Sequence, residues 1–294
     1  MNTQKIEFNK ILLFWFPIVA GFLVLYIPTY YTLATTIWTT DQQGHGPIIL
    51  LISMFFIWTK RAFLFELANV KPNVFFGGLF LLLGLFLYVI GRSQGLIFLE
   101  VVSQLFVLVS ILLLVFGMRG VKHFWFPLLF LVFMLPLPGS FVDALTLPMK
   151  IAVSHVAEGI LYQFGYPVAR DGVILQIGYY KLLVADACAG LHTVFTLEAM
   201  GLLYLHLIKR DSFVRNVSLA VLIVPIAFCA NVVRVMILVL ITYYYGDEVG
   251  QGFIHDFAGF VLFATALLFI IGTDSLIHYF ERRYSKAQKK SLEK

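Results

Sequence analysis

The chain has 294 residues, of which 61% are hydrophobic and only 13% are charged. A soluble domain carries about 25% charged residues, so the polar groups here are too few to cover a water-exposed surface. The composition therefore indicates a membrane protein. It excludes disordered, fibrous and nucleic-acid-binding classes, despite a net charge of +5.

Apolar runs recur along the chain, and crossing the hydrocarbon core takes about 20 such residues. The first run follows a charged N-terminal segment, as in a signal peptide. It is too long for the apolar core of such a peptide and no small-residue cleavage site follows, so we predict a span that is retained. The predicted spans number eight, the second being the shortest: 11–33, 46–59 (extending toward 65), 74–91, 95–117, 121–138, 187–208, 214–244 and 253–277.

The segment 139–186 is the one long stretch that is not continuously apolar. Its first part mixes apolar and polar positions and suits an amphipathic interfacial helix. Its second part alternates around Gly172 and Gly178 like short strands joined by turns. The predicted fold is thus an all-α polytopic membrane protein of about eight transmembrane helices, with a short outward-facing helix/strand segment between spans 5 and 6. Residues 1–280 would form a single membrane domain, and 281–294 a basic cytoplasmic tail.

The distribution of Lys and Arg predicts the orientation, because cytoplasmic loops are enriched in both. Of the 21 basic residues, sixteen fall on the side of the N-terminus and four on the opposite side. We therefore expect both termini in the cytoplasm and 139–186 outside. The remaining basic residue is Arg234, which lies inside the seventh span.

Arg234 is the outstanding polar residue, since ionisable groups at membrane depth are costly and usually mark function or a buried pair. It lies 18 residues beyond position 216, where the span enters from the cytoplasm, which is about 27 Å of helical rise. Asn231 precedes it by three residues on the same helix face. The alternative is an arginine whose guanidinium extends along the surface to the outer interface.

Cys188 and His255 fall at the same predicted depth as Arg234, at the outer ends of spans six and eight. A cysteine in a first helical turn feels the positive end of the helix dipole, which favours the thiolate. Taken alone, each has an ordinary explanation: a small packed cysteine and a tolerated interfacial histidine. Together, a thiol, an imidazole and a guanidinium can supply a nucleophile, a proton-transfer group and charge stabilisation for acyl transfer.

Other polar residues could support this site. His192 competes for the role of base, since it lies four residues after Cys188 on the same helix face. Asp186 and Asp256 could orient an imidazole or simply face water, and His45 could line the same cleft.

Three further polar features lie deeper in the spans. Cys229 suits packing, Glu198 should pair with a polar group or water, and Glu100 and Gln104 could form a polar pair one turn apart. No Cys/His spacing typical of a metal site occurs, and we expect no cofactor or metal.

Four sequence blocks resemble the exosortase/archaeosortase family of membrane cysteine transpeptidases. They are Ala187-Cys188-Ala189-Gly190-Leu191, Asn231-Val232-Val233-Arg234, His255-Asp256-Phe257-Ala258-Gly259, and Gly44-His45-Gly46 followed by an apolar run to Trp58. The similarity is dense from about 135 to 275 and weaker from 44 to 134. Ala189 departs from the Ser that many members carry, and the segment Asp186–His192 resembles the exosortase B subgroup.

The resemblance implies Cys188 as nucleophile, His255 as proton-transfer group and Arg234 as transition-state stabiliser. It also implies substrates that end in a Pro-Glu-Pro-type (PEP) motif, a transmembrane helix and a basic tail, cleaved at the outer face of a bacterial inner membrane. Two alternatives stay open. One is an enzyme that uses His192 as base, and the other is a transporter or polysaccharide/lipid-export component whose path includes Arg234 and Glu198.

Overall fold

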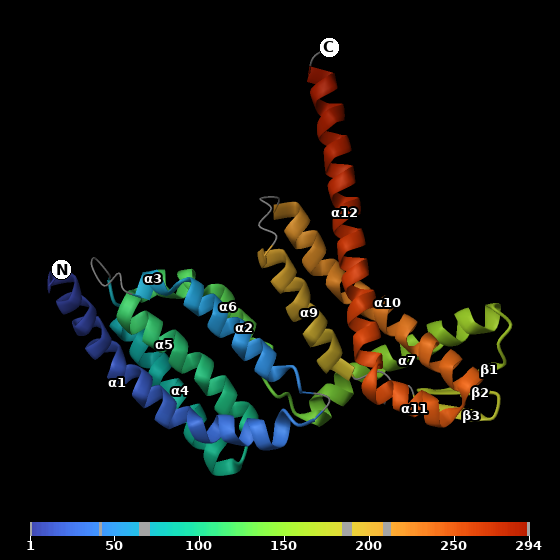
Figure 1. Ribbon diagram of the computed structural model, residues 1–294, viewed down its shortest axis with the longest axis horizontal. Coiled ribbons are helices and arrows are strands. Elements are labelled where there is room, and N and C mark those ends of the chain that lie inside the picture. The colour runs from blue at the N-terminus through green and yellow to red at the C-terminus, as the bar shows by residue number, and fades with distance from the viewer. Residues whose placement is uncertain (1, 41–42, 65–70, 184–189, 208–212, 293–294) are drawn as a thin grey trace. The chain divides into compact units, whose positions relative to one another are not determined.

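The computed structural model describes the chain except residues 1, 41–42, 65–70, 184–189, 208–212 and 293–294. The described residues are almost entirely helical, with one small sheet (Figure 1). They form two compact units, 1–138 and 139–294. The helices make the chain a polytopic, mainly α membrane protein.

The first unit is helical throughout its described secondary structure. Its elements are α1 (Asn2–Thr32), a π-helical turn η1 (Leu33–Ile37), α2 (Gly46–Thr59), α3 (Arg61–Leu64), α4 (Val74–Gln94), α5 (Ile97–His123) and α6 (Trp125–Val132). A tight turn joins α4 to α5, because Gly95 ends α4 at φ 67°, a left-handed conformation that glycine adopts without strain.

A row of glycines brings α4 and α5 together. Gly77, Gly84 and Gly91 recur every seventh residue on α4 and are all buried. An added Cβ would lie 2.7 Å from the Leu114 side chain at Gly77, and 2.9 Å from Val107 Cγ2 at Gly84. The absence of side chains thus permits the close backbone approach that membrane helix pairs favour.

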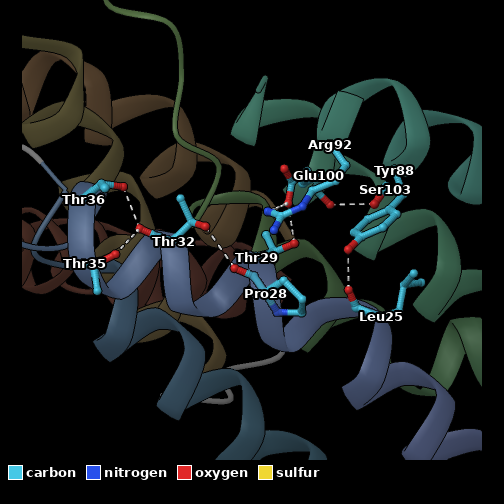
Figure 2. Close-up of polar contacts among 10 residues, drawn as sticks. All are labelled: Leu25, Pro28, Thr29, Thr32, Thr35, Thr36, Tyr88, Arg92, Glu100 and Ser103. Carbon is cyan, nitrogen blue, oxygen red and sulfur yellow. Dashed lines mark hydrogen bonds and ion pairs between the residues drawn. The ribbon is translucent and has the colours of Figure 1, made fainter. Parts of the chain in front are cut away.

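A buried polar cluster links α1 to this helix pair (Figure 2). The Thr29 hydroxyl donates to Glu100 Oε2 over 2.5 Å, and Arg92 Nη1 lies 3.7 Å from the same oxygen. Glu100 is only 2% exposed. A carboxylate at this depth is costly unless it is paired and hydrogen-bonded, so these contacts explain how it is accommodated.

Two more bonds extend the cluster along α5. The Tyr26 and Ser103 hydroxyls are 2.9 Å apart, and Gln104 Nε2 lies 2.5 Å from the Tyr30 hydroxyl. The expected Glu100–Gln104 pair is therefore wrong. Although the two residues share a face, both side chains bond to α1 because that face packs against it.

The second unit combines long helices with three short strands. Its elements are α7 (Gly139–Gln163), β1 (Val168–Asp171), β2 (Ile174–Ile177), β3 (Tyr180–Leu183), α9 (Gly190–Leu207), α10 (Phe213–Tyr245), α11 (Asp247–Asp256) and α12 (Ala258–Leu292). The strands pair antiparallel in the order β1-β2-β3. The turns fall at Gly172 and Gly178, both with positive φ, where the sequence alternation breaks.

The sheet packs on α7 and on the last part of α10. Leu175 and Ile177 are fully buried against α7 and α10 residues, as expected from the two-residue period of a strand. Arg170 Nε lies 3.0 Å from Glu158 Oε2, and Ser154 Oγ donates to the Gly172 carbonyl over 3.0 Å. These bonds fix the first hairpin to α7.

Five described helical segments are long and apolar enough to cross a membrane: Leu13–Ile37, Val74–Gln94, Ile97–His123, Val221–Tyr245 and Phe260–Tyr279. The other three expected spans contain shorter helices, α2, α6 and α9. Helix α6 ends at Val132, before Pro136 and Pro138, which lack the amide hydrogens that continue a helix. The count of eight spans and the outward position of 139–186 stay predictions. Helix α12 continues to Leu292 through the predicted tail.

Candidate functional site

Arg234 and Asn231 lie one turn apart on α10, and both are enclosed by protein. Arg234 is 4% exposed and Asn231 is 2% exposed. This burial argues against an arginine that extends along the surface to the outer interface. Among the described residues, none hydrogen-bonds to either polar atom of the Asn231 side chain. An unsatisfied buried amide costs about 1–3 kcal/mol, so this position has a cost that packing alone does not explain.

Two apolar clusters pack against the part of α10 that carries Asn231 and Arg234. Val232 and Val235 belong to the cluster that α10 shares with α7 and the sheet. On another side, Ala227 and Ala230 pack with Leu262 and Ala266 of α12. Small side chains on both helices permit close packing, and the part of α10 that carries Arg234 is therefore held from two sides.

The packing of α9 on α10 brings the start of α9 level with Arg234. Gly201 lies against the side chain of Ile223, so closely that an added Cβ would overlap its Cδ1. The two helices run in opposite directions. Gly190 is eleven residues from Gly201, and Arg234 is eleven residues from Ile223. Both distances are about 16 Å of helical rise, so Gly190 and Arg234 lie at a similar level along this helix pair.

The packing of α12 on α10 gives the same level for the start of α12. Leu262 and Ala266 pack with Ala230 and Ala227. Ala258 lies four residues before Leu262 on α12, and Arg234 lies four residues after Ala230 on α10, so both are at a similar distance from this cluster. Arg234 thus lies at a similar level along the packed helices as the first residues of α9 and α12. Figure 1 shows the starts of α9 and α12 at the same end of this unit.

A tight corner returns the chain from α10 to α12. Gly246 has φ 90°, and its amide donates to the Thr242 carbonyl over 3.0 Å. Gly250 lies directly against the Thr242 side chain, where an added Cβ would overlap Thr242 Oγ1. Helix α11 is therefore packed against the end of α10, and its last residues, His255 and Asp256, lead into α12.

A polar contact that the sequence analysis missed joins α9 and α12 more than three turns beyond their first residues. The Tyr204 hydroxyl donates to Asp274 Oδ2 over 3.0 Å, and Asp274 is 4% exposed. The signal was available, because Asp274 is a carboxylate within the predicted span 253–277. Such residues in membrane spans are rare and usually paired.

The structure describes the other predicted site residues only in part. Cys188 and Asp186 lie outside the described residues. His192 belongs to α9, and His255 and Asp256 to α11, but only the backbone of these three is described. The role of each as a site residue therefore stays a prediction.

His45 is the N-cap residue of α2 in the first unit. The next residue, Gly46, is buried against the indole of Trp38, where an added Cβ would overlap Nε1. This contact explains the second glycine of the Gly44-His45-Gly46 block.

Cys229 and Glu198 lie away from the level of Arg234. Cys229 is exposed on the span of α10. Glu198 is half-buried eight residues after Gly190, which places it about 12 Å along α9 from the level of Arg234. This separation gives no support to a shared path through Arg234 and Glu198. Within the described part of the chain, no three His, Cys, Asp or Glu side chains group as metal ligands.

In the comparison with family models, the model described as transmembrane exosortase matches residues 37–272. The matched range includes residues of both compact units, among them Arg234 and the first residues of α9 and α12. Comparison with curated proteins and comparison with solved structures each find no match.

Proposed function

The chain belongs to the transmembrane exosortase family, and from this we propose that it is a membrane-embedded cysteine transpeptidase that cleaves C-terminal PEP-type sorting signals of exported proteins. The observation that carries the proposal is the buried Arg234, level with the starts of α9 and α12. Helix α9 begins two residues after Cys188, and α12 begins three residues after His255.

The proposed reaction uses only side chains of this chain. The Cys188 thiolate attacks the scissile carbonyl carbon, and the Arg234 guanidinium stabilises the oxyanion that forms. His255 donates a proton to the leaving amine as the peptide C–N bond breaks, which leaves a thioester on Cys188. An amine or water then attacks the thioester, takes the acyl group and regenerates the thiol.

Substrate recognition would use the membrane itself. The substrate's C-terminal helix would lie among the spans and present its motif beside Cys188, and this placement lowers the barrier by restricting the reactants to a productive geometry. The substrate's basic tail would contact anionic lipid at the cytoplasmic face, because this chain is also basic there. We accordingly propose an inner-membrane location, cytoplasmic termini and a periplasmic site. On the segment Asp186–His192 alone, we propose the exosortase B subgroup.

A processing assay tests the proposal. The full chain is co-expressed with a protein that ends in a PEP motif, a transmembrane helix and a basic tail, and the cleaved product is followed on gels. We expect Cys188→Ala to abolish processing and Cys229→Ala, the matched control at the other cysteine, to retain it. Processing in Cys188→Ala would refute the proposal. Retention in His255→Ala with loss in His192→Ala would assign the base to His192.

A further inference from the structure

Aromatic side chains gather where the last turns of α10 meet α7 and the sheet. We name these residues the tyrosine collar, and its members are Tyr162, Phe164, Tyr166, Tyr179, Tyr243, Tyr244 and Tyr245. Several are largely exposed: Tyr162 is 71% exposed, Phe164 74%, Tyr245 72% and Tyr179 fully. A cluster of exposed aromatic side chains of this size indicates a surface that contacts a protein, a membrane or a ligand.

Contacts join Tyr166, Tyr243 and Tyr244 at the centre of the collar. The Tyr166 and Tyr244 hydroxyls are 3.1 Å apart, and the Tyr166 and Tyr243 rings pack edge to face with centroids 5.7 Å apart. The β2–β3 turn reaches the same place, since a Cβ at Gly178 would lie 4.0 Å from the Tyr243 ring. Tyr179, next in that turn, extends the collar to the tip of the sheet.

The position of the collar indicates its partner. Tyr243, Tyr244 and Tyr245 are the last three residues of the span Val221–Tyr245, and the end of a span lies at the boundary between hydrocarbon and headgroups. Tyrosine is enriched at that boundary, because its ring is apolar and its hydroxyl is polar. A protein-binding surface would need no such placement at the end of a span.

Helix α7 also carries exposed apolar side chains. Leu147 and Ile151, four residues apart on one side of the helix, are 49% and 41% exposed, whereas Val153, Ala157 and Leu161 are buried in the core. In Figure 1, α7 runs across the direction of α12, as a helix lying along a membrane surface would. Exposed apolar side chains of this kind fit the acyl boundary of a bilayer.

We propose that the tyrosine collar binds the interfacial region of the lipid bilayer, so that the β2–β3 turn and the last turn of α10 rest in the headgroup layer. The partner is lipid, recognised by ring burial at the acyl boundary and by hydroxyl groups toward the headgroups. This inference does not depend on peptidase activity.

Site-specific cross-linking tests the proposal. Tyr179 or Tyr245 is replaced by p-benzoylphenylalanine in the full chain, which is reconstituted in vesicles of phosphatidylethanolamine and phosphatidylglycerol, irradiated and analysed by mass spectrometry. The matched control is the same replacement at Asp171. Asp171 is exposed beside the β1–β2 turn, at the other end of strand β2 from the turn that carries Tyr179. Gel filtration and thermal unfolding establish that each variant is folded.

We expect phospholipid adducts at both collar positions, in several-fold higher yield than at Asp171. Absence of lipid adducts at both positions in folded protein would overturn the proposal. Adducts to residues 1–138 or to a second copy would also overturn it, because the collar would then be a protein-covered face.

Discussion

The hydroxyl of Tyr204 donates to the buried carboxylate of Asp274, and this bond joins the helix that follows Cys188 to the helix that follows His255. Tyr204 is 14 residues from the start of α9, and Asp274 is 16 residues from the start of α12. The contact therefore links the two helices at similar distances from their N-terminal ends. It helps to fix their relative register, and hence the level at which those ends lie.

Removing this bond should slow processing without abolishing it. We expect Tyr204→Phe to lower the processing rate several-fold and to reduce stability by about 1 kcal/mol, as for other hydrogen bonds between membrane helices. Asp274→Asn should retain most of the rate, because its amide oxygen can still accept. Tyr31→Phe, at an exposed tyrosine of α1, is the control. Equal rates in Tyr204→Phe and Tyr31→Phe would contradict a positioning role.

The close contact of Gly201 with Ile223 should be sensitive to side-chain size. Gly201→Ala adds a Cβ that overlaps Ile223, and overpacking of this kind costs about 1–3 kcal/mol. We expect lower thermal stability and slower processing, both partly restored by the second change Ile223→Ala. The control is Gly272→Ala, at a helical glycine with no neighbour within 4 Å of the added atom. If the double variant shows no restoration, the proposed register is wrong.

The polar cluster of the first unit should stabilise the packing of α1 on α5. Thr29→Val keeps the shape and removes the hydroxyl that donates to Glu100, and a hydrogen bond to a charged group contributes about 1.5–3 kcal/mol. Unfolding measured in mixed micelles should report a loss in that range. Thr35→Val is the matched control, because Thr35 is exposed and, within the described part of the chain, bonds to carbonyls of its own helical segment only. A similar loss in both variants would mean that the Glu100 contact adds nothing specific.

Arg234 should contribute to the rate rather than to substrate binding. Loss of one oxyanion donor in an enzyme costs about 10²–10³ in kcat, and we expect a loss of that order for Arg234→Ala in the processing assay. Arg234→Lys should recover part of it, since the charge remains but the planar fork of donors is lost. Protein amounts and gel-filtration profiles must match the unsubstituted chain. Normal processing in a folded Arg234→Ala variant would exclude Arg234 from the reaction.

Much of the fold follows from sequence patterns with a direct physical cause. Apolar length predicts the long helices, and the glycines at 172 and 178 mark the turns between the strands. The unusual position of Arg234 was also evident, because a charge within an apolar run is costly. Its burial was not, since a guanidinium in the outer leaflet could equally reach the interface.

Other features depend on which faces of distant segments meet. The glycines at 77, 84 and 91 have a regular spacing, but their partners on α5 follow only from the packed helices. In the same way, Glu100 and Gln104 share a helix face, yet both bond to α1. The Tyr204–Asp274 contact joins residues 70 positions apart, and no local pattern identifies such a pair.

Detection of an acyl-enzyme on Cys188 tests the central claim most directly. Purified full-length protein in vesicles is incubated with a substrate that ends in a PEP motif, a helix and a basic tail, quenched in acid, and digested for mass spectrometry. We predict an adduct on Cys188 whose mass equals the N-terminal part of the substrate and which hydroxylamine releases, as expected of a thioester. Cys229 should carry none. Cleavage of the substrate without an adduct on Cys188, and with full activity in Cys188→Ala, would contradict the account.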